Sequence, residues 1–397
     1  MAPITSDVHY DPDSSEVAYD PWALFKRLRD EAPLYYNAEH DFYALSRFED
    51  VERVHVDRET YSSTMGATLE MIKLARAGLY EIPPGTVIFE DAPSHTIHRA
   101  LLSRMFTPRR VTELEPMIRQ VTREMIDPTV ETGRFDFVVD LGNVMPSLVI
   151  GMLIGIPEED RLAIRDHYGK SQDEKDASGV NILSGEVFAD YLDWRVEHPS
   201  DDIMTQLLNA EVDDLEGGRR RLTREELLAY VNIVAAAGND TTRRLIGWMG
   251  KVLSDHPDQR QKLVDDPGLI PGAVDELLRY EPPALHSGRY VLRDVELYGQ
   301  TVPAGSIMLP MLGAANRDER RIDDPDRFDV TRKQTGMFTF GFGAHYCLGQ
   351  ALARLEGRVA LEEILARFPT WEADESGAVF AFNGDLRGWD AFPVVGS

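Results

Sequence analysis

The single cysteine of this chain, Cys347, lies in a segment whose residues favour chemistry over simple packing. The segment reads Phe340-Gly341-Phe342-Gly343-Ala344-His345-Tyr346-Cys347-Leu348-Gly349, and an amphipathic helical pattern follows it. Glycines at these positions let the backbone turn sharply or approach a flat ligand closely. Amide groups at the start of a helix favour negative charge and lower the pKa of a thiol. We therefore expect Cys347 to be a thiolate that ligates a soft metal; the alternative is a small buried apolar residue.

One cysteine also limits the other kinds of site. It excludes an intramolecular disulfide and any zinc or iron-sulfur centre built from several cysteines of this chain. A cysteine-nucleophile hydrolase would need a base and an orienting group beside the thiol, and the sequence offers no convincing pair near Cys347. If this cysteine takes part in chemistry, it does so as the only thiol.

A second candidate site interrupts an apolar helical pattern with polar residues. Residues 232–242 read NIVAAAGNDTT. A glycine costs a helix interior about 1 kcal/mol relative to alanine, and Asp240 and Thr241 compete for backbone hydrogen bonds. We expect a bend or groove at Gly238, with Thr242 behind it. The alternative is a glycine kink with an aspartate that faces solvent.

A third candidate is the pair Glu276 and Arg279. The two side chains are three residues apart and so share one face of a helix. Taken alone, such a pair is typical of a solvated helix surface and contributes little to stability.

The elements that would position these residues are mainly helical. Apolar residues at three- and four-residue spacing predict helices over 49–56, 109–126, 224–253, 271–280 and 349–368. Strand signals occur at 42–45, before a turn near Ser62 and Ser63, and at 289–309, and 380–395 looks like a final hairpin. Residues 64–87 and 166–185 are poorly patterned and are expected to form loops or helices over a pocket. We find no repeat and no linker, and so expect one domain over residues 1–397.

Composition excludes several classes of function. The chain has 42 Lys and Arg against 68 Asp and Glu, a formal net charge of −26, which argues against nucleic-acid binding. Residues 1–20 contain neither a basic nor an apolar leader region, so we expect no signal peptide or membrane anchor, and a cytoplasmic monomer.

The cysteine segment resembles the haem-binding signature of the cytochrome P450 family, which has a phenylalanine, two glycines and then Cys-x-Gly. Phe340, Gly341, Cys347 and Gly349 fill these positions. The resemblance extends over nearly the whole chain. It implies a mainly α (α+β) fold in one helix-rich domain with a small β region, haem b as cofactor, and Cys347 as the axial thiolate that favours O–O cleavage.

The same resemblance assigns roles to several charged residues. His95 and Arg99 look like the family's propionate-binding helix, and Arg289 and His345 stand at its other propionate positions. His98 is left as a structural residue. Glu276 and Arg279 would form a bracing network with Arg327, for which Arg332 is an alternative third member.

The polar run in the long helix is similar to the family's oxygen-binding groove. The groove would comprise Ala237 and Gly238, with Thr241 supporting bound dioxygen and Asp240 relaying protons. Candidate residues of a hydrophobic substrate pocket, each of which is as plausible in the core, are Ile233, Val234, Ala237, Pro283, Ala284, Leu285, Phe382 and the segment 71–79.

The resemblance implies a monooxygenase that hydroxylates a fatty acid, terpenoid, steroid or aromatic compound. The chain has no flavin or nicotinamide motif, so electrons would come from a separate ferredoxin and its reductase. An acidic ferredoxin is expected near Arg109, Arg110 and Arg354. Two alternatives stay open: a peroxygenase, isomerase or dehydratase on the same fold, which the intact Asp240 and Thr241 pair argues against, and a haem-binding sensor or carrier without turnover.

Overall fold

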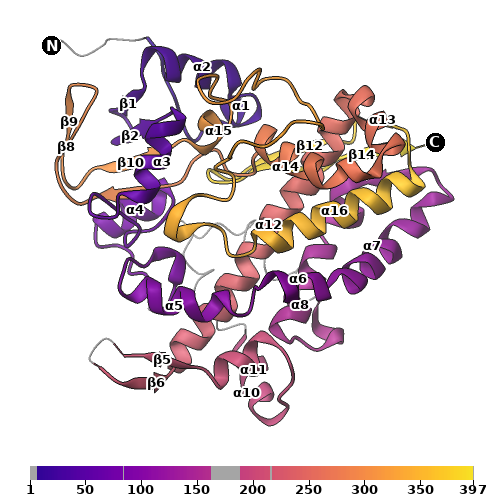
Figure 1. Cartoon of the computed structure of the whole chain (residues 1–397), viewed down its shortest axis with the longest axis horizontal. Coiled ribbons are helices and arrows are strands. Elements are labelled where there is room, and N and C mark those ends of the chain that lie inside the picture. The colour runs from indigo at the N-terminus through magenta and orange to yellow at the C-terminus, as the bar shows by residue number, and fades with distance from the viewer. Residues whose placement is uncertain (1–6, 84, 162–187, 215–216, 397) are drawn as a thin grey trace.

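The computed structural model describes residues 7–83, 85–161, 188–214 and 217–396, and helices dominate them. Figure 1 shows the long helix α12 (Arg224–Asp255) crossing the molecule, with further helices on one side and the largest sheet on the other. The other helices are α1 (Ser15–Tyr19), α2 (Trp22–Glu31), α3 (Phe48–Val56), α4 (Leu69–Arg76), α5 (Ser94–Ser103), α6 (Pro108–Glu113), α7 (Glu115–Val130), α8 (Met145–Ile154), α10 (Ala189–Glu197), α11 (Ile203–Leu208), α13 (Pro257–Asp265), α14 (Ile270–Tyr280), α15 (Leu312–Ala315) and α16 (Gln350–Arg367). Short 3-10 or π turns are η1 (Val87–Phe89), η2 (Phe137–Gly142), η3 (Glu158–Asp160), η6 (Pro267–Leu269) and η7 (Gly343–His345).

The largest sheet has five strands in the order β1-β2-β10-β7-β3. They are β1 (Leu34–Asn37), β2 (Phe42–Leu45), β10 (Ile307–Pro310), β7 (Arg289–Val291) and β3 (Tyr61–Ser62). Only the β2 and β10 pair is parallel. β7 is an inner strand of this sheet, and Arg289 at its start pairs with Met308 of β10.

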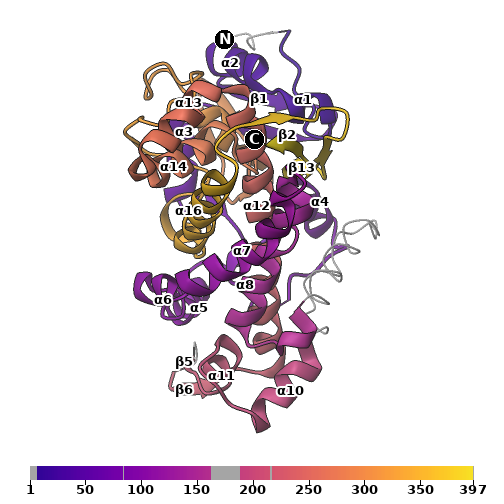
Figure 2. The same cartoon turned by 90° about the vertical axis from the view of Figure 1, so that its right-hand side faces the viewer.

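The remaining strands form one small sheet and three hairpins. The order β11-β14-β4 joins β11 (Trp371–Ala373), β14 (Pro393–Gly396) and β4 (Arg134–Asp136). The hairpins are β12 (Val379–Phe382) with β13 (Arg387–Ala391), β5 (Glu211–Asp213) with β6 (Arg219–Arg221), and β8 (Val295–Leu297) with β9 (Gln300–Val302). Figure 2 shows β5 and β6 together with α10 and α11 at the end of the molecule opposite the amino terminus.

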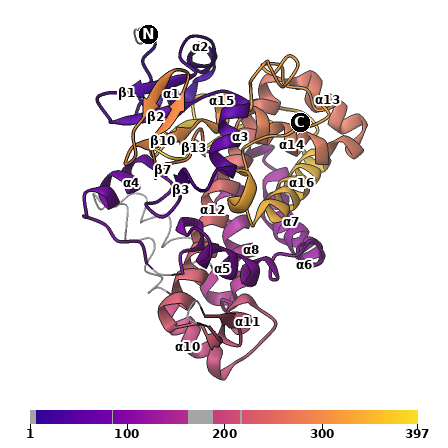
Figure 3. The same ribbon diagram turned by 60° about the vertical axis from the view of Figure 1, so that its left-hand side comes forward.

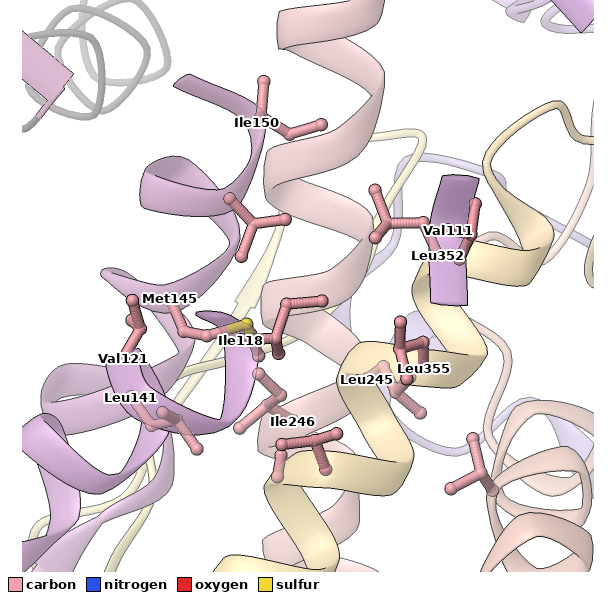
Figure 4. Packing of buried hydrophobic residues seen from close by; sticks show 14 of the residues in the cluster. Val111, Ile118, Val121, Leu141, Met145, Ile150, Leu245, Ile246, Leu352 and Leu355 are labelled. Atoms are coloured by element: carbon pink, nitrogen blue, oxygen red, sulfur yellow. The ribbon is translucent and has the colours of Figure 1, made fainter. Parts of the chain in front are cut away.

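The centre of the core lies around α12. This helix begins at a capping box, in which Thr223 and Glu226 satisfy each other's backbone amides. It then packs against α8 and η2 on one side and against α14 and α16 on another. Figure 4 shows Met145 and Ile150 on one side of α12, and Leu352 and Leu355 of α16 on the other, all within the main core cluster. α12 is therefore held on several sides, and its exposed face can be used for a ligand.

The bend expected at Gly238 does not interrupt α12, which is helical throughout. An added Cβ at Gly238 would overlap Cδ1 of Ile150, so the missing side chain lets α8 approach closely. The local cost of glycine is thus offset by packing between two helices.

Other sequence predictions needed smaller corrections. The helix expected over 109–126 is two helices, α6 and α7, because Pro116 begins a new helix after Leu114. The final hairpin stops at Ala391, and β14 joins a different sheet. Residues 64–87 contain α4 and lead into η1. The segment 166–185 lies outside the described residues.

Within the part of the chain that the structure describes, one helical stretch, Phe137–Ile154, is apolar and long enough to cross a membrane. In this fold 61% of it is buried, as expected of a core helix. Large buried clusters include residues from Val8 to Val394, which supports a single domain over 1–397; that assignment stays a prediction.

Candidate functional site

The segment before α16 holds Cys347 in a tight loop. Its amide donates to the carbonyl of Phe340 (2.8 Å), and the amide of Gly341 donates to Phe338 (2.7 Å). Gly341 and Gly343 both have φ of 68°, the left-handed region that favours glycine. A Cβ on Gly343 would also lie 3.0 Å from the carbonyl of His55 on α3. The glycines are therefore explained by the turn and by the approach of α3.

The sulfur lies at the start of α16, as the sequence predicts, with Gly349 as the N-cap residue. The amides of Gly349 and Gln350 and the guanidinium groups of Arg99 and Arg354 favour the thiolate. Burial nevertheless dominates and raises the pKa of the Cys347 thiol. The helix amides thus favour the thiolate, as expected from the sequence, and a coordinated cation would offset the cost of burial.

The four residues expected to bind propionates converge on one cavity. His95 and Arg99 come from α5, Arg289 from β7 and His345 from η7, and all four line the same cavity. The rings of His95 and His345 have centroids 4.2 Å apart. Figure 3 shows α5 below the five-stranded sheet that carries β7. The other lining residues are His55, Ala67, Val87, Ile88, Ser287, Leu312, Phe340 and Gly341.

Electrostatics in this cavity favour an anion. Burial lowers the pKa of Arg289 to about 10, and burial together with His95, Arg289 and Arg99 lowers the pKa of His345 to about 3. Arg289 is only 7% exposed. Its Nη1 donates to the carbonyl of Gly288 (2.7 Å), and Arg99 Nη2 donates to the carbonyl of Tyr346.

Among the described residues, no carboxylate lies within ion-pair distance of Arg99 or Arg289. Asp91 acts on Arg289 from farther away, while its oxygens accept hydrogen bonds from Ser62 and Ser63. A buried guanidinium without a counter-ion is costly. A flat apolar ligand with carboxylates, bound next to Cys347, would supply both the missing anions and the missing cation. Haem b has this chemistry, so the residues fit it.

On α12, Ala237 and Thr241 are one helical turn apart on an exposed face. The Thr241 hydroxyl donates to the carbonyl of Ala237 (2.9 Å). Asp240 points elsewhere: its Oδ1 lies 2.6 Å from Nη2 of Arg243, while its Oδ2 is buried and has no hydrogen-bond partner in the described part of the chain. Arg243 also contacts Asp390 on β13 (3.3 Å).

Comparisons with known proteins agree with this geometry. Residues 268–380 match the family model described as Cytochrome P450. The chain is 36% identical over 390 residues to Cytochrome P450 130 of Mycobacterium tuberculosis, covering 94% of each protein. It is 36% identical to the Vitamin D(3) 25-hydroxylase of Pseudonocardia autotrophica, covering 88% of this chain and 87% of that protein. The structure superposes on CYP109Q5 from Chondromyces apiculatus with a TM-score of 0.86, 34% identity and 98% coverage of both chains.

The chain belongs to the cytochrome P450 family. It therefore has the helix-rich α+β P450 fold, and it is a P450 monooxygenase whose cofactor is haem b held through a cysteine thiolate. Cys347 is the one cysteine available for that bond.

The bracing network expected around Glu276 is present in this P450, with one change of member. Glu276 is fully buried, and Arg279 donates to both of its oxygens at 2.8 Å. Arg332, not the side chain of Arg327, supplies the second guanidinium, with Nε 3.0 Å from Oε1. The side chain of Arg327 is 60% exposed, and only its carbonyl takes part, as an acceptor for Arg279 and Arg332.

Two of the expected substrate-pocket residues are core residues. Val234 belongs to the main core cluster, and Leu285 packs with the cluster that contains Phe25, close to Gly313. Ile233 instead contacts Phe89 in a small cluster with Ala67, which also lines the cavity. Ala284 bridges to Leu386, and Phe382 is partly exposed on β12.

Glu356 was not predicted from the sequence. This side chain is buried on α16, and its Oε2 accepts a hydrogen bond from Thr242 of α12 (3.3 Å). Its Oε1 has no hydrogen-bond partner among the residues that the structure describes, and burial raises the pKa of Glu356 to about 8. Nothing in the local pattern distinguishes it from the paired surface glutamates of the same helix.

Replacing Arg332 with Gln should destabilise the protein by about 1–3 kcal/mol, because Oε1 of the buried Glu276 loses a charged donor. Arg327→Gln removes an exposed guanidinium and should change the free energy of unfolding by less than about 0.5 kcal/mol. Denaturant unfolding of the haem-loaded proteins measures both. Equal losses in the two variants would contradict the assignment of Arg332.

Glu356 predicts a specific pH dependence of stability. A carboxyl whose pKa is higher in the folded protein than in the unfolded chain binds more protons when folded, so its contribution is complete below the ordinary glutamate pKa and is lost as pH rises through about 8. Glu356→Gln should therefore gain stability relative to the parent protein between about pH 5 and pH 8, on the order of 1–3 kcal/mol. Unfolding curves at several pH values test this, with the exposed Glu372→Gln as the control. A parallel shift at every pH would refute it.

Proposed function

We propose that this P450 hydroxylates a hydrophobic small molecule, using dioxygen and electrons from a separate ferredoxin and reductase. The observation that carries the proposal is the cavity in which His95, Arg99, Arg289 and His345 meet beside the Cys347 loop without a carboxylate partner for either arginine among the described residues. The balanced reaction takes the substrate C–H bond, one dioxygen, two electrons and two protons to an alcohol and water.

Different residues would have different roles in this reaction. Cys347 would ligate the iron, and His95, Arg99, Arg289 and His345 would bind the propionates. Bound haem supplies the oxidising chemistry, while the protein supplies the thiolate, an enclosed site and timed protons.

Proton delivery would involve α12. The Thr241 hydroxyl lies on the exposed face with Ala237, and Asp240 could reach it by exchanging its contact with Arg243. Arg243 already touches a second carboxylate, Asp390, so such an exchange would leave the guanidinium paired. The intact Asp240 and Thr241 pair supports use of dioxygen over a peroxide-driven or isomerase reaction. A carrier or sensor would form no product when ferredoxin, reductase and a nicotinamide donor are supplied.

The names of several similar proteins mention hydroxylation or a bound organic compound. They include the Vitamin D(3) 25-hydroxylase named above, the hydroxylase HmtN of himastatin biosynthesis (31% identity, TM-score 0.81) and EryK bound to erythromycin B (32% identity, TM-score 0.82). Together with the apolar cluster of Ile233 and Phe89, they support a fatty acid, terpenoid, steroid or aromatic substrate.

Replacing Cys347 with Ser should abolish the strongly red-shifted absorbance of the reduced carbon monoxide complex, because an alcohol is a far weaker ligand than a thiolate. Ser103→Ala, away from the loop, serves as the control and should retain the band. Persistence of that band in Cys347→Ser would disprove the assignment of the ligand.

An acidic ferredoxin would dock near Arg109 and Arg110. The Arg109 side chain is 90% exposed and pairs with Glu113 on the same helix (3.0 Å), and Arg110 is 40% exposed; exposed pairs of this kind contribute little and can be exchanged. Arg354 is a weaker candidate than the sequence indicated, since it packs over the Phe340 ring and donates to Asp275 (2.7 Å).

Reversing both charges, Arg109→Glu with Arg110→Glu, should slow reduction by a ferredoxin about 10-fold or more at low salt, with a smaller effect at high salt. The measurement is reduction under carbon monoxide, followed by absorbance. Arg293→Glu, exposed at the sheet, is the matched control. An unchanged rate and salt dependence would rule out this docking site. The cytoplasmic location and the monomeric state stay predictions.

A further inference from the structure

A second polar cluster lies outside the cavity, at the start of α12. Its members are Glu90, which follows η1, His98 on α5, Arg220 on β6 and Glu226 in the first turn of α12. Figure 1 shows α5 and the β5 and β6 hairpin close to this end of α12. The side chains of Glu90, His98 and Glu226 are only 15%, 10% and 7% exposed.

His98 stands between two carboxylates. Its Nδ1 lies 2.8 and 2.9 Å from the two oxygens of Glu90, and its Nε2 lies 4.0 Å from Oε1 of Glu226. The Glu226 carboxylate also receives two bonds from Arg220 at 2.7 Å and one from the amide of Thr223 at 2.8 Å. Arg220 therefore compensates Glu226, whereas His98 is the group that contacts Glu90.

The protonation state of this imidazole changes its contacts. A neutral imidazole has one N–H; if that proton is on Nδ1 and donates to Glu90, the lone pair of Nε2 faces Glu226. The imidazolium has two N–H groups and a positive charge, so it attracts both carboxylates. Protonation thus strengthens the link between Glu90 and α12.

Glu90 ends a segment that forms part of the cavity wall. Val87 and Ile88, just before it, line the cavity, and Phe89 packs against Ile233 of α12. The same segment touches α12 at Gly85, where an added Cβ would lie 3.1 Å from Cα of Glu226. Loss of the contact between Glu90 and His98 would therefore weaken the packing of segment 85–90 against α12. It would also weaken the packing of this segment against α5, the helix that bears His95 and Arg99.

The other charged or titratable groups near His98 have partners of their own or lie at the edge of this cluster. Asp91 accepts from Ser62 and Ser63, and Asp214 acts on Arg220 from the hairpin. Tyr230 of α12 places its ring edge-on to His98, with 5.7 Å between centroids. On α5 itself His95 and Arg99 face the cavity, and on β5 Glu211 and Asp213 lie near Arg219.

We propose that His98 is a positioning residue that, when protonated, clamps the segment before α5 against α12 and so narrows the entry of bulky ligands to the haem. This inference rests on the proposed function, because it assumes that the cavity wall borders the route to the iron. It predicts that entry becomes faster as pH rises and the imidazole loses its proton.

Two isocyanides of different size test the clamp, since neither titrates and both bind haem iron. For the haem-loaded protein, the association rate of cyclohexyl isocyanide should rise about 5-fold between about pH 5.5 and pH 8.5, and that of methyl isocyanide by less than about 2-fold. His98→Gln should bind the bulky ligand quickly at every pH. Glu90→Gln, which keeps a hydrogen-bonding group beside His98, should also flatten the profile.

His40→Gln is the matched control. His40 likewise lies near two carboxylates, Asp11 at 3.7 Å and Asp13 at 3.8 Å, but it is not among the cavity-lining residues. Its replacement should leave the pH profile of the parent protein unchanged. This control separates the effect of replacing any histidine near two carboxylates from the effect of replacing His98.

The outcomes separate the clamp from the haem assignment. The clamp would be overturned if the association rate of cyclohexyl isocyanide did not change with pH in the parent protein, or changed with pH equally in His98→Gln. It would also be overturned if pH affected the association rates of both isocyanides equally. A protein that forms no isocyanide complex would instead contradict the proposed function. In that case hydrogen exchange of amides 85–90 still tests the clamp: exchange should be slower in the parent than in His98→Gln at low pH and equal at high pH, and no difference at low pH would refute it.

Discussion

The buried Arg289 and the half-buried Arg99, which have no carboxylate partner among the described residues, are the constraint on which this site depends. Arg99 and Arg289 meet His95 and His345 around one cavity, and each arginine makes a short bond to a backbone carbonyl. Backbone carbonyls compensate only part of a buried charge. The Cys347 thiol points in the same direction, because burial raises its pKa and a coordinated cation would offset that by stabilising the thiolate. The arginines around the cavity favour carboxylates, and the thiolate of Cys347 favours a metal ion. Together they fit a ligand that carries both carboxylates and a metal.

The Glu276 network supplies the rigidity that this site needs. Arg332 and Gln334 bind Glu276 just before the chain enters the cysteine loop. A few residues later Asn316 accepts from the amide of Phe338, and Thr339 donates to the carbonyl of Leu278 on α14 (2.6 Å each). The loop is therefore fastened to α14 by hydrogen bonds at successive positions. Such fastening fixes the sulfur relative to α12, and loss of one member would displace the others.

Much of the fold and the identity of the main site residues could be predicted from sequence. The long apolar helix, β2 and the start of α16 were confirmed because periodicity and capping act locally. The wider family resemblance pointed to the four residues that line the cavity, and their contact with propionates stays a prediction. The choice between Arg327 and Arg332 could not be made, since it depends on which arginine the chain turns inward. The packing role of Gly238 could not be predicted for a similar reason: the glycine lets α8 approach through Ile150, which is distant in sequence. Glu356 was missed because burial, not residue type, makes it unusual.

The two buried charge clusters differ in what completes them. Glu276 finds all of its donors within the chain, at distances of 2.8 to 3.1 Å, so folding alone can build that network. Arg99 and Arg289, in contrast, have no carboxylate partner within the described chain. Burial, together with the positive charges nearby, lowers the pKa of His345, and the arginines here must be compensated by hydration or by a bound anion. The helices α14 and α16 should thus form a scaffold that does not depend on the cofactor, while the contact between α5 and η7 gains its stability from haem. Cofactor binding would then stabilise mainly the residues that line the site, while α14 and α16 fold without it.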